Sequence, residues 1–197
     1  MRGISFSNMT QTPLRKPWVG SEYESQKNKV LFVAESSYSK NHFDENKDNA
    51  NLTIACVEQY SNYEWGNRTW DNMISNFGEI FGITAGEEKS RKKFFDKISH
   101  TNYIQHLMMH TGESPFNYYI HNEQYRQHLY NTIEEVKPDC VILISQRLND
   151  LWAYEGCGIV QHLKDNKIGY YHTKHLSRIS NVNKLEIQKI VQEIIAK

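Results

Sequence analysis

Short, uninterrupted apolar runs alternate along this chain with segments of helical periodicity. Residues 29–34 and 140–144 are the clearest runs, and their length and composition are typical of strands buried on both faces. Residues 100–105 and 167–171 are predicted as two further strands. Such strands belong to parallel sheets that carry helices on either side. The pattern therefore predicts an α/β fold, a three-layer α/β/α sandwich around a mostly parallel four-stranded sheet.

The segments between and after these runs have the apolar spacing of amphipathic helices. The predicted helices cover residues 52–60, 69–81, 87–98, 122–136, 146–152 and 182–196. Residues 1–28 are polar and irregular and are assigned no element. With no internal repeat and no linker, the 197 residues form one domain, which is long enough for a full hydrophobic core.

Composition excludes several classes of protein. The 23 basic and 23 acidic side chains balance, so bulk positive charge does not bind nucleic acid, and any such contact needs a local patch. No apolar segment reaches the roughly 18 residues of a membrane span, and the start lacks a signal-peptide core. Cys56, Cys140 and Cys157 include no C-x-x-C pair and are expected as reduced thiols, with Cys140 in the core. We therefore expect a cytoplasmic protein without membrane partner, metal or cofactor.

Polar residues follow the predicted strands, where parallel α/β folds bind their ligands. Glu35, Asn102 and His175 are the side chains of greatest chemical interest in these segments. No G-x-G-x-x-G, Walker A, G-x-S-x-G or H-E-x-x-H motif occurs, which removes most of the support for dinucleotide, P-loop and common hydrolase chemistry. The four strand-end segments are 35–38, 102–105, 145–147 and 172–178.

Four motifs along the chain resemble those of the uracil-DNA glycosylase superfamily. Residues 30–38 read Val-Leu-Phe-Val-Ala-Glu-Ser-Ser-Tyr and resemble its first motif, a buried strand that runs into G-Q-D-P-Y or G-E-x-P-G. Residues 101–104 (Thr-Asn-Tyr-Ile) resemble the strand whose Asn reads the base, and residues 137–143 resemble the third strand. Residues 175–178 (His-Leu-Ser-Arg) resemble the H-P-S signature. The order and spacing agree over residues 17–197, as in a divergent member with one uracil-DNA-glycosylase-like domain.

The resemblance implies a DNA glycosylase, a hydrolase that flips a pyrimidine out of DNA and leaves an abasic site. Such a reaction creates a cationic sugar and an anionic base, and these need a donor at the base and an acid or water near the sugar. His175 is the candidate donor, and Glu35 is the candidate that orients water or stabilises the sugar. Asn102 offers an amide that matches a pyrimidine edge.

The resemblance also implies further contacts with DNA. Tyr38 falls where the family places a Tyr that blocks bulky groups at pyrimidine C5, and Phe43 lies in the loop that carries a stacking aromatic. The candidates for binding DNA phosphates are Ser36, Ser177 and Arg178, of which arginine gives bidentate contacts.

The sequence departs from the family pattern at several positions. Ala34 replaces a Gly, and Ser36 stands where efficient relatives carry the water-activating Asp, so Glu35 is the only acid of the motif. Ser37 and Leu176 replace prolines, which makes both loops less rigid. The chain also lacks the four cysteines of the iron–sulfur branches. The sequence leaves open which base is excised, uracil or a modified pyrimidine such as some phages use. It also leaves open whether the role is repair or defence.

Alternatives remain open from sequence. His172 competes with His175 as the donor, because it lies three residues upstream in the same segment. The chain is either a monomeric glycosylase, a non-catalytic nucleic-acid-binding module of the same fold, or an unrelated α/β enzyme acting on a small nucleotide. Residues 161–197 carry seven Lys or Arg against three acids, which indicates a basic face next to His175.

Overall fold

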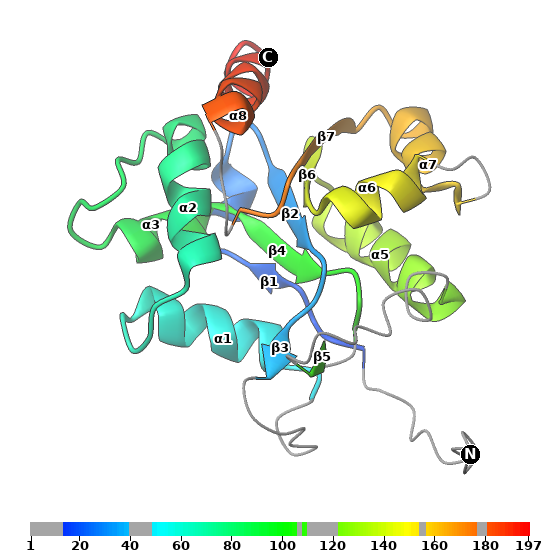
Figure 1. Ribbon diagram of the computed structural model, residues 1–197, viewed down its shortest axis with the longest axis horizontal. Helices are drawn as coiled ribbons and strands as arrows, with labels where there is room; N and C mark the ends of the chain where they lie inside the picture. Colours follow the sequence, from blue (N-terminus) through cyan, green and yellow to red (C-terminus); the bar gives the residue numbers. More distant parts are fainter. Residues whose placement is uncertain (1–13, 40–48, 106–107, 110–121, 154–156, 177–180) are drawn as a thin grey trace.

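The computed structural model describes residues 14–39, 49–105, 108–109, 122–153, 157–176 and 181–197, with the backbone alone at 38–39, 108–109 and 181–182. Its centre is a five-stranded sheet in the order β1-β4-β2-β6-β7 (Figure 1). The last four of these strands run parallel, and β1 pairs antiparallel with β4. The strand bounds are β1 (Trp18–Val19), β2 (Val30–Ala34), β4 (Ser99–Asn102), β6 (Cys140–Ile144) and β7 (Gly169–Thr173).

The α/β class is confirmed, and the four parallel strands lie in the predicted segments, although β4 ends at Asn102, three residues earlier than expected, and β7 begins two residues later. The predicted number of strands was wrong, because β1 adds an antiparallel edge strand within the N-terminal segment expected to be irregular. A strand of two residues is too short to produce a recognisable periodicity in the sequence. Tertiary contacts hold β1 in place, since Ser99 Oγ donates to the Trp18 carbonyl at 2.7 Å and Trp18 Nε1 donates to the Phe95 carbonyl at 2.7 Å.

Helices connect the strands in the predicted order, and one additional helix, α7, precedes β7. This helix follows Gly158, whose φ of +74° is in the left-handed region, and its seven residues were not predicted. The predicted helix over 69–81 divides into α2 and a 3-10 helix, η2. The helix bounds are η1 (Tyr23–Ser25), α1 (Leu52–Ser61), α2 (Arg68–Phe77), η2 (Gly78–Phe81), α3 (Ser90–Lys97), α5 (Glu123–Val136), α6 (Gln146–Trp152), α7 (Ile159–Asp165) and α8 (Asn181–Ile195). Two further strands, β3 (Tyr38–Ser39) and β5 (Met108–Met109), pair with each other in a separate sheet.

Alternate side chains of β2 divide the core into two layers. Val30 and Phe32 pack with residues of α1, α2, α3 and α8 on one face, and Leu31 and Val33 pack with α5, α6 and α7 on the other. Figure 1 shows α2 and α3 on one side of the sheet and α5 to α7 on the other. Each fully buried side chain of this size contributes about 1.5–3 kcal/mol. The arrangement has the predicted three layers.

The register of the sheet brings the carboxyl ends of its parallel strands together. Ala34, the last residue of β2, pairs with Asn102 of β4 and with Ile144 of β6, and Ile144 pairs with Thr173 of β7. The residues that follow these positions therefore emerge at one edge, which we call the carboxyl edge. Within the described part of the chain, no helix has the length and apolar character needed to cross a membrane.

Candidate active site

Glu35 leaves β2 at the carboxyl edge and is only 5% exposed. Its backbone carbonyl accepts from Ile104 N at 2.9 Å, which joins it to the end of β4. Its carboxylate accepts from Ser145 Oγ at 2.9 Å through Oε2 and forms an ion pair with Arg147 Nη2 through Oε1. A buried carboxylate is costly without such partners, and here they come from the segment that follows β6.

Ser145 connects this carboxylate to a helix. Its Oγ accepts from Leu148 N at 3.2 Å, as the N-cap of α6, and also donates to Glu35. Because the Leu148 N–H occupies a lone pair of the hydroxyl, the hydroxyl proton is free to point toward the carboxylate. The start of α6 therefore supplies an oriented donor to Glu35.

Sequence reasoning assigned no role to Arg147, nor to Ser145. Arg147 lies in the strand-end segment 145–147, and the rule that ligands bind at the ends of parallel strands is the signal that leads to it. Its side chain is 53% exposed, whereas that of Glu35 is 6% exposed. The guanidinium thus joins a buried carboxylate to the protein surface.

Asn102 ends β4 beside Glu35 and is 6% exposed. Its Nδ2 donates to Ser37 Oγ at 3.1 Å, and its backbone carbonyl accepts from Gln105 Nε2. Gln105 is held in turn, because its Oε1 accepts from Arg15 N at 2.7 Å. The side-chain amide therefore contacts the segment after β2, in addition to the local backbone contacts of the turn.

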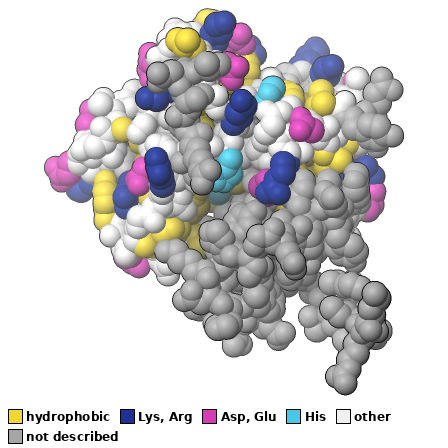
Figure 2. All heavy atoms as spheres, in the orientation of Figure 1, with side chains coloured by type: hydrophobic (Ala, Val, Ile, Leu, Met, Phe, Trp, Pro, Cys, Tyr) yellow, Lys and Arg dark blue, Asp and Glu magenta, His cyan; other side chains and the backbone are white. Residues whose placement is uncertain are grey.

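His175 lies two residues beyond the end of β7 and is exposed to solvent. Part of its imidazole is nevertheless buried, and this burial lowers the pKa of His175 from its ordinary value. The Glu35 carboxylate raises that pKa, and the Arg147 guanidinium lowers it. Those two charges come from β2 and α6, so three different elements meet here. His172 is also exposed but lies within β7, paired in register with Leu143. Figure 2 shows exposed histidine side chains near the middle of this face, with Lys and Arg side chains close by.

The remaining predicted site residues are reported as far as they are described. Ser36 is half-buried, and its Oγ donates to the carbonyl of Ser37 at 3.1 Å. The side chains of Tyr38, Phe43, Ser177 and Arg178 lie outside the described residues.

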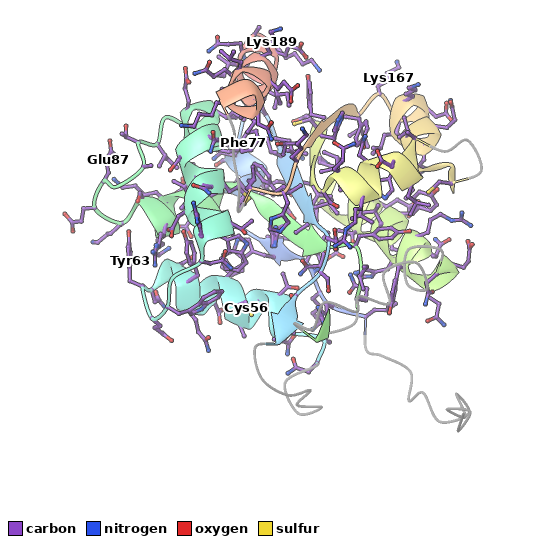
Figure 3. The ribbon with its side chains drawn as sticks, viewed as in Figure 1. Cys56, Tyr63, Phe77, Glu87, Lys167 and Lys189 are labelled. Atoms are coloured by element: carbon purple, nitrogen blue, oxygen red, sulfur yellow. The ribbon has the colours of Figure 1, made fainter. Side chains whose placement is uncertain are left out.

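Among the described residues, the basic side chains of the C-terminal segment do not all lie next to His175, so the predicted basic face was wrong for part of the set. Lys167 precedes β7, and Lys197 Nζ lies 5.7 Å from the ring centre of Tyr171, close to the start of the same strand. Both therefore lie toward the amino ends of the strands. Figure 3 labels Lys167 beside α7 and Lys189 on α8, near the top of the view. Lys174 is exposed and adjoins His175.

The described residues contain no group of three or more His, Cys, Asp or Glu side chains arranged to hold a metal ion. The three cysteines are free thiols, and Cys140 is confirmed as a core residue at 3% exposure. Burial raises the pKa of Cys140 to about 12, which makes it a poor nucleophile.

In comparisons with known proteins, no family model matches the sequence and no curated protein matches it. The fold and the site define an α/β protein with a buried carboxylate, a buried amide and an accessible imidazole at the carboxyl edge of its sheet. The function is inferred from these residues.

Proposed function

We propose that this protein is a DNA glycosylase that flips a pyrimidine into the carboxyl edge of its sheet and hydrolyses the N-glycosidic bond, leaving an abasic site. The observation that supports the proposal is the meeting of Glu35, Asn102 and His175 at one edge. They are the three chemically distinctive residues of the motifs, and they reach this edge from β2, β4 and β7. We further propose that the protein acts on DNA as a monomer in the cytoplasm.

His175 has the properties of a neutral hydrogen-bond donor. Because partial burial lowers its pKa, the imidazole is uncharged at neutral pH and still carries one N–H. In the proposed reaction, that N–H donates to the pyrimidine oxygen on which negative charge develops as the base departs. A donor placed where charge develops stabilises the transition state more than the bound substrate.

Glu35 is better suited to orient water than to stabilise a cationic sugar by charge alone. The Arg147 guanidinium offsets much of the carboxylate's negative charge. Ser145 and Arg147 orient the carboxylate. In the proposed reaction, Glu35 accepts a hydrogen bond from the water that attacks the sugar carbon. This role compensates for Ser36, which replaces the Asp of the related motif.

Asn102 is the proposed reader of the base edge, and its contact with Ser37 bears on which base is read. A hydroxyl both donates and accepts, so Ser37 satisfies the amide in either orientation. A proline at this position, as in the related motif, has no hydroxyl to do so. The site is therefore compatible with a uracil-type edge or with the edge of a modified cytosine. Excision of uracil fits repair, and excision of a modified phage-type base fits defence.

The test is incubation of the protein with single- and double-stranded DNA containing uracil, modified uracils or modified cytosines, followed by alkaline cleavage of abasic sites. We expect cleavage at one class of base. Glu35→Ala and His175→Ala should each lower base release by about 10²-fold or more while changing DNA affinity much less. His172→Ala is the matched control, and a larger loss in this variant reassigns the donor to His172.

The same experiment separates the competing classes of function. DNA binding without base release from any substrate would contradict the glycosylase and favour a non-catalytic binding module. Absence of both would favour an enzyme that acts on a small nucleotide.

A further inference from the structure

We propose that Arg147 is a positioning residue of the carboxyl-edge site, whose guanidinium fixes the Glu35 carboxylate beside His175. The inference deepens the proposed glycosylase function and rests on it. It concerns a residue that no motif of the sequence singles out, and it is argued from the contacts of α6, β2 and the segment after β7.

The first support is the geometry of the pair. Glu35 is buried, and its carboxylate is held by two donors that stand two residues apart at the start of one helix, Ser145 and Arg147. The Ser145 hydroxyl is itself anchored by Leu148 N at 3.2 Å. Both donors therefore come from the start of one helix, and together they constrain where the carboxylate oxygens lie.

The second support is that the main chain of Glu35 is held from the opposite side. Its carbonyl accepts from Ile104 N at 2.9 Å, beyond the end of β4, while the carboxylate is held from the β6 side. With its backbone fixed by β4, the remaining freedom of Glu35 lies in its side-chain torsions. The pair with Arg147 restricts these torsions, and sites of this kind need reacting groups held within about 0.5 Å of their working positions.

The third support is that both members of the pair act on His175. The Glu35 carboxylate raises the pKa of His175 and the Arg147 guanidinium lowers it, beside the lowering by partial burial. One of these two charges comes from the end of β2 and the other from α6. Removal of Arg147 should therefore raise the pKa of His175, and Glu35→Gln should lower it.

The experiment compares the full-length protein with Arg147→Ala, Arg147→Lys and Arg147→Gln. The matched control is Arg126→Ala, which removes another arginine–glutamate ion pair, with Glu123 on α5. Three quantities are measured: the single-turnover rate of base release, the affinity for the same DNA, and the titration of His175 by NMR of its imidazole carbons. We expect Arg147→Ala to lower the rate by about 10- to 100-fold, since a misplacement of about 1 Å has effects of this size. DNA affinity should change less than the rate, Arg147→Lys should recover part of the rate, and Arg126→Ala should behave like the unaltered protein.

Each outcome decides the inference. An unchanged rate and an unchanged His175 titration in Arg147→Ala would overturn it, and so would a loss of DNA affinity as large as the loss of rate. If Arg147→Ala does not fold, Arg147→Gln supplies the same comparison with a neutral donor. If the unaltered protein releases no base from any DNA, the proposed function fails, whereas the titration still tests the positioning of Glu35. In that case the effect of Glu35→Gln on the His175 pKa is measured with and without Arg147: a smaller effect in the Arg147→Ala background supports the inference, and an equal effect overturns it.

Discussion

Ser145 is where a single substitution tests the site and the fold at once. Its hydroxyl accepts from Leu148 N at 3.2 Å and donates to Glu35 Oε2 at 2.9 Å, and the residue is 2% exposed. Ser145→Ala removes both hydrogen bonds and almost no volume. The change therefore reports on the hydrogen bonds with little contribution from packing.

The magnitude follows from the two contacts. Loss of a serine N-cap costs about 0.5–2 kcal/mol, and loss of a hydrogen bond to a charged group costs about 1.5–3 kcal/mol. Because the contacts share one oxygen, their effects are coupled, and we expect Ser145→Ala to lower the free energy of unfolding by about 2–4 kcal/mol. For a chain of this length, each kcal/mol corresponds to about 2–4 °C in Tm.

Urea denaturation followed by tryptophan fluorescence measures the difference, with equal m values showing that the unfolding transition itself is unchanged. Ser25→Ala is the control, because Ser25 Oγ donates to the carbonyl of Glu22 at an exposed position. We expect this control to stay within about 0.5 kcal/mol of the unaltered protein. A loss for Ser145→Ala no greater than that for Ser25→Ala would refute the reasoning, because the carboxylate would then not depend on this hydroxyl.

Three other predictions concern the base edge, the buried histidine and a close backbone approach. Asn102→Asp should shift the ratio of single-turnover rates toward cytosine-type bases by roughly 1–3 kcal/mol, because a carboxylate accepts from the cytosine amino group and repels the uracil carbonyl; an unchanged ratio would make Asn102 a turn residue. Burial lowers the pKa of His100 to about 4, from a value near 6.5 in the unfolded chain. The stability contributed by the neutral buried imidazole is therefore fully present above pH 6.5 and is lost as the pH falls toward 4, by roughly 3 kcal/mol in total. His100→Phe should remove this part of the pH dependence in urea denaturation at pH 7 and pH 4.5, and an identical slope in both proteins would contradict the assignment. Gly20→Ala should lower the free energy of unfolding by about 1–3 kcal/mol, because the added Cβ would lie 2.2 Å from the Asp96 carbonyl oxygen. Gly66→Ala is the control, since a Cβ at that position meets nothing within 4 Å. Equal stability of the two variants would count against the close approach.

The strands at the centre of the fold were predictable because their signal is local. A run such as 30–34 is buried on both faces, so every position is apolar, and the pattern needs no knowledge of neighbouring strands. The turn at Lys137, whose φ is +46°, precedes Pro138 and ends α5 where the sequence indicates. For both the strand and the helix end, the residues that determine the structure lie within a few positions of it in the sequence.

The elements that sequence reasoning missed are short and depend on distant contacts. β1 has two residues, and its place follows from pairing with β4, about 80 residues later, as in the hydrogen bond from Ser99 to Trp18. α7 has seven residues, too few for an amphipathic pattern to stand out. The spread of the C-terminal cations was also decided by topology, because Lys167 and Lys197 lie toward the amino ends of the strands while Lys174 lies at their carboxyl ends.

The acid, the amide and the imidazole at the strand ends could be identified from local sequence, since Glu35 and His175 follow predicted strands, Asn102 lies within another, and parallel strands end at a common edge. The groups that surround these three residues depend on tertiary contacts. Ser145 and Arg147 contact Glu35 although they lie 110 and 112 residues further along the chain. They reach it because β6 lies next to β2 and because both donors stand at the start of α6, the helix that follows β6. No local periodicity encodes which donor meets a buried carboxylate, because that choice depends on the order and register of strands that are distant in the chain.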